Sequence, residues 1–224
     1  MTRTLTPKGA ATRRRIVEGA AAEIRERGVA ATTLEDVMAR TRTSKSQVFH
    51  YFPQGKDELL LAVAQFEADR VLADQQPQLG DLSTRAGWHR WRDALVERYR
   101  AQGSSCPLAM VNSHLGRNTA GTQAVVSGLM HRWEGELRAG IERMQAAGDA
   151  DPAVDAGLAA AALLAGIQGG VGLLLATGST AHLEAALDVT LAHLQRGQAT
   201  ATAARPPSTS STVPCTNSAS SEAR

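Results

Sequence analysis

Apolar residues recur three and four positions apart along most of the chain, and this spacing predicts helices. The first such stretch runs from about Thr12 to Arg27 and stops at Gly28, a residue that commonly ends helices; its apolar stripe is Ile16, Val17, Ala20, Ala21 and Ile24. No segment alternates apolar and polar residues as a half-buried strand does. The predicted fold class is therefore all-α. Further helices are expected over 83–102, 107–117, 121–147, 152–176 and 180–195, with Pro107 and Pro152 at first helical positions and Asp151 as a cap.

Two short helices joined by a tight turn are expected after the first helix. Thr33 is a typical N-cap for a helix through Arg40, and Ser44 is one for a helix over 45–51. A long helix over 56–75 should come next. Two short helices joined by a three-residue turn, behind a longer helix, match a helix-turn-helix unit. An ordinary helical hairpin with exposed polar residues would show the same spacing.

The second short helix has an apolar side and a polar side. Val48 and Phe52 lie four residues apart and are expected to pack inward. The residues left for the outer face and the helix ends are Lys45, Ser46, Gln47, His50 and Tyr51. In a major groove, the Gln47 amide could read adenine N6 and N7, and Lys45 could reach guanine O6 and N7. The Thr33 hydroxyl, the amides of its helix N-terminus and Lys56 are suited to phosphate oxygens.

The charge of the chain is unevenly distributed. The 224 residues carry a formal net charge of +2, which divides into +6 for residues 1–56 and −4 for residues 57–224. A basic segment before an acidic remainder indicates that the segment meets a polyanion. A few arginines on one solvated helix face, such as 13–15, would give the same imbalance.

Composition narrows the class of protein further. A hydrophobic share of 43% is enough for a sizeable core and excludes wholesale disorder. Cys106 and Cys215 are too few for a disulfide framework or a zinc module. No apolar signal-peptide segment occurs at the N-terminus, so secretion is not expected.

A string of motifs spans residues 12–60: Ala-Ala-Thr-Thr-Leu-Glu-Asp-Val at 30–37, Ser-Lys-Ser at 44–46, Val-Phe-His-Tyr-Phe-Pro at 48–53, and Lys-Asp-Glu-Leu-Leu at 56–60. This segment resembles the DNA-binding domain of the TetR family of bacterial repressors, apart from one extra residue before Lys56. The resemblance implies binding to double-stranded operator DNA, with Lys45, Ser46 and Gln47 near base edges and Thr33, His50, Tyr51 and Lys56 on the backbone. The full set of expected DNA contacts is Thr33, Arg42, Thr43, Ser44, Lys45, Ser46, Gln47, Phe49, His50, Tyr51 and Lys56.

The chain departs from the family pattern at three places: the turn, Phe49 and Ile24. Thr-Arg-Thr fills the turn at 41–43, where the family usually has Ala-Gly-Val. Arg42 is therefore expected to adopt a positive φ that glycine would accept cheaply, at a strain of about 1 kcal/mol, and to touch a phosphate in return. Phe49 stands where tyrosine is usual, which removes a phenolic hydrogen bond to phosphate, and Ile24 replaces a usual buried phenylalanine. These changes are expected to alter affinity or operator preference.

The rest of the chain carries a second resemblance. Cys-Pro-Leu at 106–108, Arg-Trp-Glu at 132–134 and Gln-Gly-Gly at 168–170, together with the extra residue before Lys56, resemble the LmrA/YxaF-like branch of the TetR family. This resemblance implies a helical domain that binds a small, largely apolar effector and forms a homodimer through its last two helices. Candidate effector residues by helical position, each of which could instead be an ordinary core or surface residue, are Trp88, Trp91, Cys106, Asn112, His131, Trp133 and Gln168.

Residues 156–176 hold no charged side chain and are long enough to cross a bilayer. Gln168 at the centre, five glycines and the lack of a flanking Lys/Arg cluster favour instead a helix buried at a dimer interface. We therefore expect no membrane anchor, with a membrane-spanning helix as the alternative.

Three regions are expected: a DNA-binding domain at 1–56 with helix 56–75 as the connection, an effector-binding and dimerisation domain at 57–196, and a disordered tail at 197–224. Enzyme motifs are absent from the sequence, so no catalytic residue, metal or cofactor is expected. The predicted function is a cytoplasmic, nucleoid-associated repressor that releases a pseudo-palindromic operator when its effector binds. A DNA-free ligand-binding or adaptor dimer is the alternative.

Overall fold

The computed structural model of the chain describes residues 5–103 and 119–203, with side chains as far as Leu194. Both ranges are free of strands, so the predicted all-α class is confirmed. The elements are α1 (Pro7–Ala31), α2 (Leu34–Thr41), α3 (Lys45–Tyr51), α4 (Lys56–Ala73), a 3-10 turn η1 (Gln78–Gly80), α5 (Arg85–Gln102), α7 (Ala120–Ala146), α8 (Ala156–Thr177) and α9 (Ala181–Ala203).

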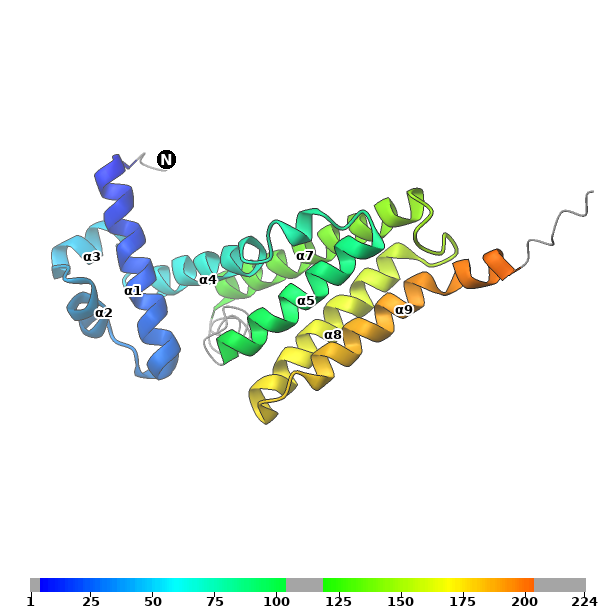
Figure 1. Ribbon diagram of the computed structural model, residues 1–224. Coiled ribbons are helices and arrows are strands. Elements are labelled where there is room, and N and C mark those ends of the chain that lie inside the picture. The colour runs from blue at the N-terminus through cyan, green and yellow to red at the C-terminus, as the bar shows by residue number, and fades with distance from the viewer. Residues whose placement is uncertain (1–4, 104–118, 204–224) are drawn as a thin grey trace, which may run out of the picture.

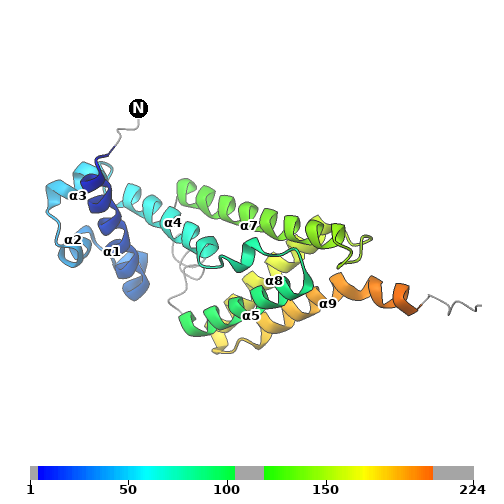
Figure 2. The same ribbon diagram turned by 45° about the horizontal axis from the view of Figure 1, so that its top comes forward.

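The helices form two groups joined by α4. Helices α1, α2 and α3 make a head at one end, and α5, α7, α8 and α9 make a body at the other (Figure 1). The view in Figure 2 keeps the same separation. In the head, α1 packs on α2 and α4; in the body, α4 packs on α7, α7 on α8, and α8 on α9. Helix α4 thus touches both groups.

Helix α4 also takes part in two hydrophobic cores. Its first half contributes to the head core with Leu59, Leu60, Val63 and Ala64, and its second half contributes to the body core with Ala68 and Val71. The head core is completed by the predicted stripe of α1, including Ile16 and Ile24, and by Val48 and Phe52. The two cores therefore meet within one turn of α4.

A buried carboxylate lies at that meeting point. Glu67 follows the head-core residues of α4, precedes the body-core residues, and is fully buried. Arg25 of α1 and Arg70 of α4 both donate hydrogen bonds to it, Arg70 at 3.4 Å. Burial raises the pKa of Glu67, and the two arginines oppose that effect by favouring the charged carboxylate. An ion pair thus ties the head to the connecting helix.

The observed ends of two helices differ from the predicted ones. Helix α1 begins at Pro7 instead of Thr12, because the Thr6 hydroxyl accepts from the Gly9 amide at 3.2 Å and Pro7 suits the first helical position. It is interrupted at Gly28, the predicted stop, where φ is 79°. Helix α9 continues through Ala203, so the first residues of the predicted tail are helical; alanine favours this extension.

Helix α8 also starts later than predicted. Asp155 caps it, with its carboxylate accepting from the Leu158 amide at 2.9 Å, so Asp151 and Pro152 are not the cap and first helical residue. Asp151 instead accepts from the Ala153 amide at 2.9 Å inside a turn. The helix expected over 107–117, with Pro107, lies outside the described residues.

Small residues let α8 approach its neighbour closely. A Cβ added at Gly170 would lie 2.6 Å from the Leu183 Cα of α9. Among the described residues, α8 is the one helix long and apolar enough to cross a membrane, and 44% of its most apolar stretch is buried inside the molecule. Other apolar side chains of α8, including Leu173 and Leu175, are exposed on the single chain.

Candidate nucleic-acid interface

Helix α2 starts with a reciprocal cap between Thr33 and Asp36. The Asp36 amide donates to the Thr33 hydroxyl oxygen at 3.1 Å, while the Thr33 amide and hydroxyl donate to the Asp36 carboxylate at 2.9 and 2.7 Å. The pKa of Asp36 is lowered, chiefly by the Thr33 hydroxyl and amide that bond its charged form. This cap fixes the start of α2 where an acidic first turn also suits the helix dipole.

The turn between α2 and α3 is fixed by one left-handed residue. Arg42 has φ 51° and ψ 47°, which confirms the positive φ expected there. Its amide and the Thr43 amide both donate to the Met38 carbonyl, the latter at 3.1 Å, and so close the end of α2. The Arg42 side chain is exposed beyond the turn.

Helix α3 carries a second reciprocal cap. The Gln47 amide donates to the Ser44 hydroxyl oxygen at 3.3 Å, and the Ser44 amide donates to the Gln47 side-chain oxygen at 3.0 Å. This use of the oxygen leaves the side-chain amide nitrogen of Gln47 as its outward donor. Behind the helix, Val48 and Phe52 are fully buried in the head core, as predicted. The opposite face of α3 is therefore held outward.

Most of the predicted contact residues lie on that outward surface. The exposed ones are Thr33, Arg42, Ser44, Lys45, Ser46, Gln47, Phe49 and His50, while Tyr51 and Lys56 are half-buried. The side chain of Thr43 is buried instead, with its hydroxyl 2.7 Å from that of Thr41, so it stabilises the turn from inside. The Lys56 ammonium donates to the Val29 carbonyl at 2.9 Å, which gives it a structural partner.

Ion pairs neutralise cations on one side of the head but leave those of this surface unpaired. Arg27 pairs with Asp36 at 2.8 Å, and Arg40 with Glu23 at 2.6 Å, on the side formed by α1 and α2. Among the described residues, no carboxylate forms an ion pair with Arg42 or Lys45. Lys45 lies 6.0 Å from the centre of the Phe49 ring, which flanks it. A polyanion would thus meet free cations at the turn and at the start of α3.

Sequence reasoning missed a role for Arg13. Its guanidinium lies 5.1 Å from the centre of the Phe52 ring, so it covers the buried end of α3 from α1. The sequence shows three consecutive arginines at 13–15, but no short-range pattern indicates which of them faces the Phe52 ring.

Comparison with known proteins identifies the family. Residues 16–63 match the family described as "Bacterial regulatory proteins, tetR family", and residues 84–190 match "Tetracyclin repressor-like, C-terminal domain". The chain belongs to the TetR family. It is a transcriptional regulator of that family with a helix-turn-helix DNA-binding domain, the head described above.

One relative of this TetR-family regulator is an uncharacterised HTH-type transcriptional regulator of Mycobacterium tuberculosis. It is 33% identical over 110 residues, 46% of this chain and 53% of that protein, so the chain spans about half the length of the curated relative. These matches identify the TetR family but do not separate its branches, so membership of the LmrA/YxaF-like branch stays a prediction.

Solved structures share the fold over most of the chain. A TetR transcriptional regulator from Chloroflexus aurantiacus has a TM-score of 0.68 at 22% identity and covers 85% of this chain and 98% of its own. A structure described as a SmeT–triclosan complex has a TM-score of 0.64 at 25% identity, with coverage of 81% and 90%. SmeT is described elsewhere as the repressor of a Stenotrophomonas maltophilia multidrug efflux pump.

The candidate effector residues of the regulator fall into four groups. Trp88, Trp91 and Trp133 are fully buried in the body core, and the rings of Trp88 and Trp91 meet edge to face with centres 5.5 Å apart. Gln168 is half-buried on α8, with its amide nitrogen 3.2 Å from the Met130 sulfur. His131 is exposed, so the structure does not bring it to the tryptophans. Cys106 and Asn112 lie outside the described residues.

The indole nitrogens differ in their partners. Trp91 Nε1 donates to the Gln75 side-chain oxygen at 3.0 Å, whereas Trp88 Nε1 and Trp133 Nε1 are buried without an acceptor among the described residues. The body thus holds two unused donors in an apolar interior. In the described part of the chain, no cluster of three His, Cys, Asp or Glu side chains could hold a metal ion.

Proposed function

We propose that this TetR-family regulator is a homodimeric repressor that releases a pseudo-palindromic operator when a small, largely apolar effector binds its body. The observation that carries the DNA-binding part is the outward face of α3, held by the Ser44–Gln47 cap and flanked by the unpaired Arg42 and Lys45. Such a helix can enter a major groove, and a two-fold dimer would place two copies on a two-fold site.

Base reading in this proposal falls to Gln47 and Lys45. With the Gln47 oxygen held by Ser44, its amide nitrogen is free to donate to an acceptor on a base edge. Lys45 and Ser46 complete the reading face, while Thr33, Ser44, His50, Tyr51 and Arg42 contact phosphates. The Lys56 ammonium donates to the Val29 carbonyl, so it attracts phosphates through its charge and not through a direct contact.

The proposed dimer interface is the outer face of α8 and α9. Leu158, Leu173 and Leu175 of α8 and Val189 of α9 are exposed in the single chain. Alanines and glycines separate them on α8, and such small residues allow close four-helix packing. Burial of this face in a dimer would also leave no apolar helix for a bilayer, in line with a cytoplasmic protein.

The proposed effector binds beside the tryptophans of the body. A buried N–H group without an acceptor costs about 1–3 kcal/mol of folding free energy. A largely apolar ligand with acceptor oxygens would remove this cost by accepting hydrogen bonds from the indole nitrogens of Trp88 and Trp133, which have no acceptor among the described residues. Triclosan in the complex with SmeT, a relative at 25% identity, supports an organic effector of this kind. Movement of α4, which belongs to both cores, would carry the effect to the head.

Fluorescence anisotropy with the DNA that flanks the gene of this chain tests the proposal. We expect specific binding. A plot of the logarithm of the binding constant against the logarithm of the salt concentration should have a slope of about −7, which corresponds to roughly four phosphate contacts per subunit. Light scattering should give the molar mass of a dimer. Binding to random DNA as tight as to the flanking DNA, or no DNA binding by a folded dimer, would favour the alternative of a DNA-free adaptor.

A further inference from the structure

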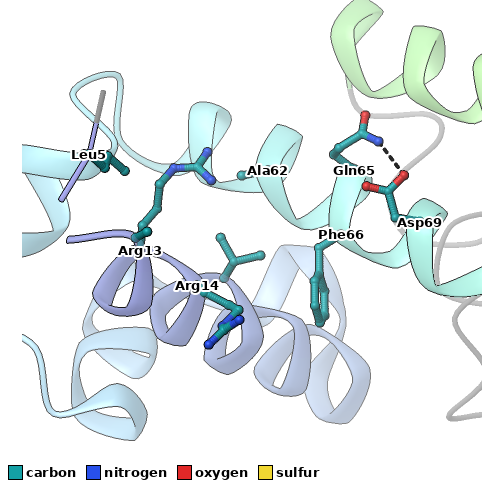
Figure 3. A pocket seen from close by; sticks show the side chains of 9 residues that line it. Leu5, Arg13, Arg14, Ala62, Gln65, Phe66 and Asp69 are labelled. Carbon is teal, nitrogen blue, oxygen red and sulfur yellow. Dashed lines mark hydrogen bonds between the residues drawn. The ribbon is translucent and has the colours of Figure 1, made fainter. Parts of the chain in front are cut away.

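A groove between α1 and α4 lies outside the DNA-facing surface and outside the tryptophan core. It has a volume of about 310 Å³, and its floor is formed by Val17 of α1 and by Ala62 and Phe66 of α4. Leu5, just before α1, forms one end of the groove. Figure 3 shows these walls, with the Phe66 ring extending from α4 toward α1. The groove thus offers an apolar bed at the surface of the head.

Arginines border this apolar bed. Arg13 and Arg14 of α1 both line it, and in Figure 3 Arg13 extends toward α4. Arg13 forms no ion pair among the described residues; Arg14 has Glu18 at 3.9 Å, a solvated contact between side chains that are 72% and 51% exposed. Such an exposed pair contributes little, so Arg14 remains available to a ligand. Arg13 lies over the Phe52 ring, but it has no anionic partner among the described residues.

The acidic residue of the groove has donors of its own. Asp69 accepts from the Gln65 amide nitrogen at 2.8 Å and from Arg132 of α7 at 3.2 Å. Its pair with Arg132 is solvated, with side chains that are 55% and 51% exposed, so Asp69 keeps part of its charge. Arg13 and Arg14 outweigh this one carboxylate, and the net charge beside the apolar bed is positive.

We propose that this groove is a second ligand site, which takes an amphipathic monocarboxylate with an aliphatic chain of medium length. The apolar bed accounts for the chain, and Arg13, which extends toward α4, accounts for the carboxylate, since a guanidinium matches carboxylate geometry. Arg14 extends the other way in Figure 3 and adds positive charge at the edge of the groove. Decanoate, an unbranched aliphatic chain that ends in one carboxylate, is a probe of this chemistry.

Binding here has a consequence for the head. The carboxylate would cancel part of the positive charge contributed by Arg13 and Arg14, and its chain would contact α1 and α4 together. Through the Asp69–Arg132 pair the groove also adjoins α7 of the body. The site itself is independent of the proposed repressor function, because the ligand binds the protein without DNA.

Isothermal titration calorimetry of the full chain with decanoate, below its micelle concentration and without DNA, tests the site. Replacing both arginines, Arg13→Gln with Arg14→Gln, should weaken binding at least about tenfold, because the charge-assisted contact of Arg13 and the nearby charge of Arg14 are both lost. Arg15→Gln is the matched control, since the exposed Arg15 neighbours both but does not line the groove; its affinity should equal that of the original chain. Decanol, which lacks the charge, should bind about tenfold more weakly than decanoate.

A pair of substitutions at the exposed Gln65 guards against misfolding of the arginine variants. Gln65→Glu should weaken decanoate binding and Gln65→Lys should strengthen it, each about threefold or more, because the charge lies at the rim. The proposal is overturned if decanoate fails to bind, or if its affinity is the same in all of these variants, which would place the binding elsewhere. Neither outcome bears on DNA binding, which is measured separately.

Discussion

The head and the body are both helical and share α4, yet different interactions position their helices. In the head, a hydroxyl group caps each short helix, paired with the Asp36 carboxylate at α2 and with the Gln47 side-chain amide at α3, and ion pairs such as Arg27–Asp36 link α1 to α2. In the body, three buried tryptophans fill the core, and glycines such as Gly170 allow close contacts between helices. Bonds within a few residues thus set the two short helices of the head. The long helices of the body are capped as well, but they are held together by packing and by ion pairs between distant segments, such as Arg92–Asp188.

This difference matches the task proposed for each region. A surface that reads bases needs its side chains held in one geometry, and caps within four residues provide that at little cost in chain entropy. A body that admits an effector needs an apolar interior with a few unused polar groups, as Trp88 and Trp133 supply. The junction at Glu67 combines both kinds of interaction, since it is an ion pair inside the shared core.

Breaking the junction should have the largest effect. In Arg25→Leu the buried Glu67 keeps only Arg70 as a partner, and the free energy of unfolding at pH 7 should fall by about 3 kcal/mol. Glu67→Gln should change it by less than about 1 kcal/mol, because Arg25 and Arg70 are both partly exposed and can be solvated. Urea denaturation of both variants and of the double variant, which should recover most of the loss, measures the asymmetry.

The pH dependence of the same pair has a definite sign. Because the folded pKa of Glu67 is raised above its ordinary value, the folded state binds the proton more tightly than the unfolded state. The contribution of Glu67 to stability is therefore fully present below that ordinary value and is lost as the pH rises through the folded pKa. Relative to Glu67→Gln, the original chain should lose stability over this window; a constant difference between the two would contradict the burial effect.

The packing of the body is tested at Gly170. A Cβ there would lie 2.6 Å from the Leu183 Cα, a backbone atom that cannot swing aside, so Gly170→Ala should cost about 2 kcal/mol. Gly128→Ala on α7 is the matched control: nothing described lies within 4 Å of its added Cβ, and alanine should stabilise that helix by about 1 kcal/mol. Thermal unfolding that moves in the same direction for both variants would disprove the close contact.

The same contrast explains what the sequence could predict. Helix α3 begins and ends as expected at Lys45 and Tyr51, because Ser44 and the buried Val48 are local signals. The predicted start of α8 is wrong because Asp151 and Asp155 are both good N-cap residues. The choice depends on distant partners: the Asp151 amide donates to the Leu194 carbonyl at 2.9 Å, and Gln145 donates to the Asp151 carbonyl at 2.9 Å.

Within the candidate interface the predictable part was also the local part. The outward residues of α3 follow from the inward position of Val48. The inward Thr43 and the bond from Lys56 to Val29 depend on Thr41 and on the end of α1, which no short-range pattern shows. Trp88 Nε1 and Trp133 Nε1 have no acceptor within residues 5–103 and 119–194, which likewise depends on how α5 and α7 pack. The sequence could name these residues but not the surroundings of their indole nitrogens.

Base reading by the head is tested at Gln47 with two variants. Gln47→Glu keeps the oxygen that accepts from the Ser44 amide, so α3 should stay capped, but it loses the outward donor and adds a repelling charge. Operator affinity should fall by more than about tenfold with an unchanged melting temperature, and Gln47→Ala should lose both cap and donor. An equal loss for operator and random DNA in Gln47→Ala would rule out a base contact; anisotropy titrations with both DNAs measure this.

The smallest expected effect concerns Arg42, where stability and DNA binding should move in opposite directions. Its left-handed backbone, with φ 51°, carries a strain that glycine would not, so Arg42→Gly should raise the free energy of unfolding by about 1 kcal/mol. The same change removes an unpaired cation beside α3, so the log–log salt slope for DNA binding should become shallower by about 1 for each subunit. Arg42→Asn is the control that keeps a residue tolerant of this backbone but drops the charge, and it should flatten the slope with a smaller gain in stability. If a variant gains stability with no change in the salt slope, Arg42 acts only in the backbone geometry of the turn and not in DNA binding. The two measurements therefore separate the backbone role of Arg42 from its electrostatic role.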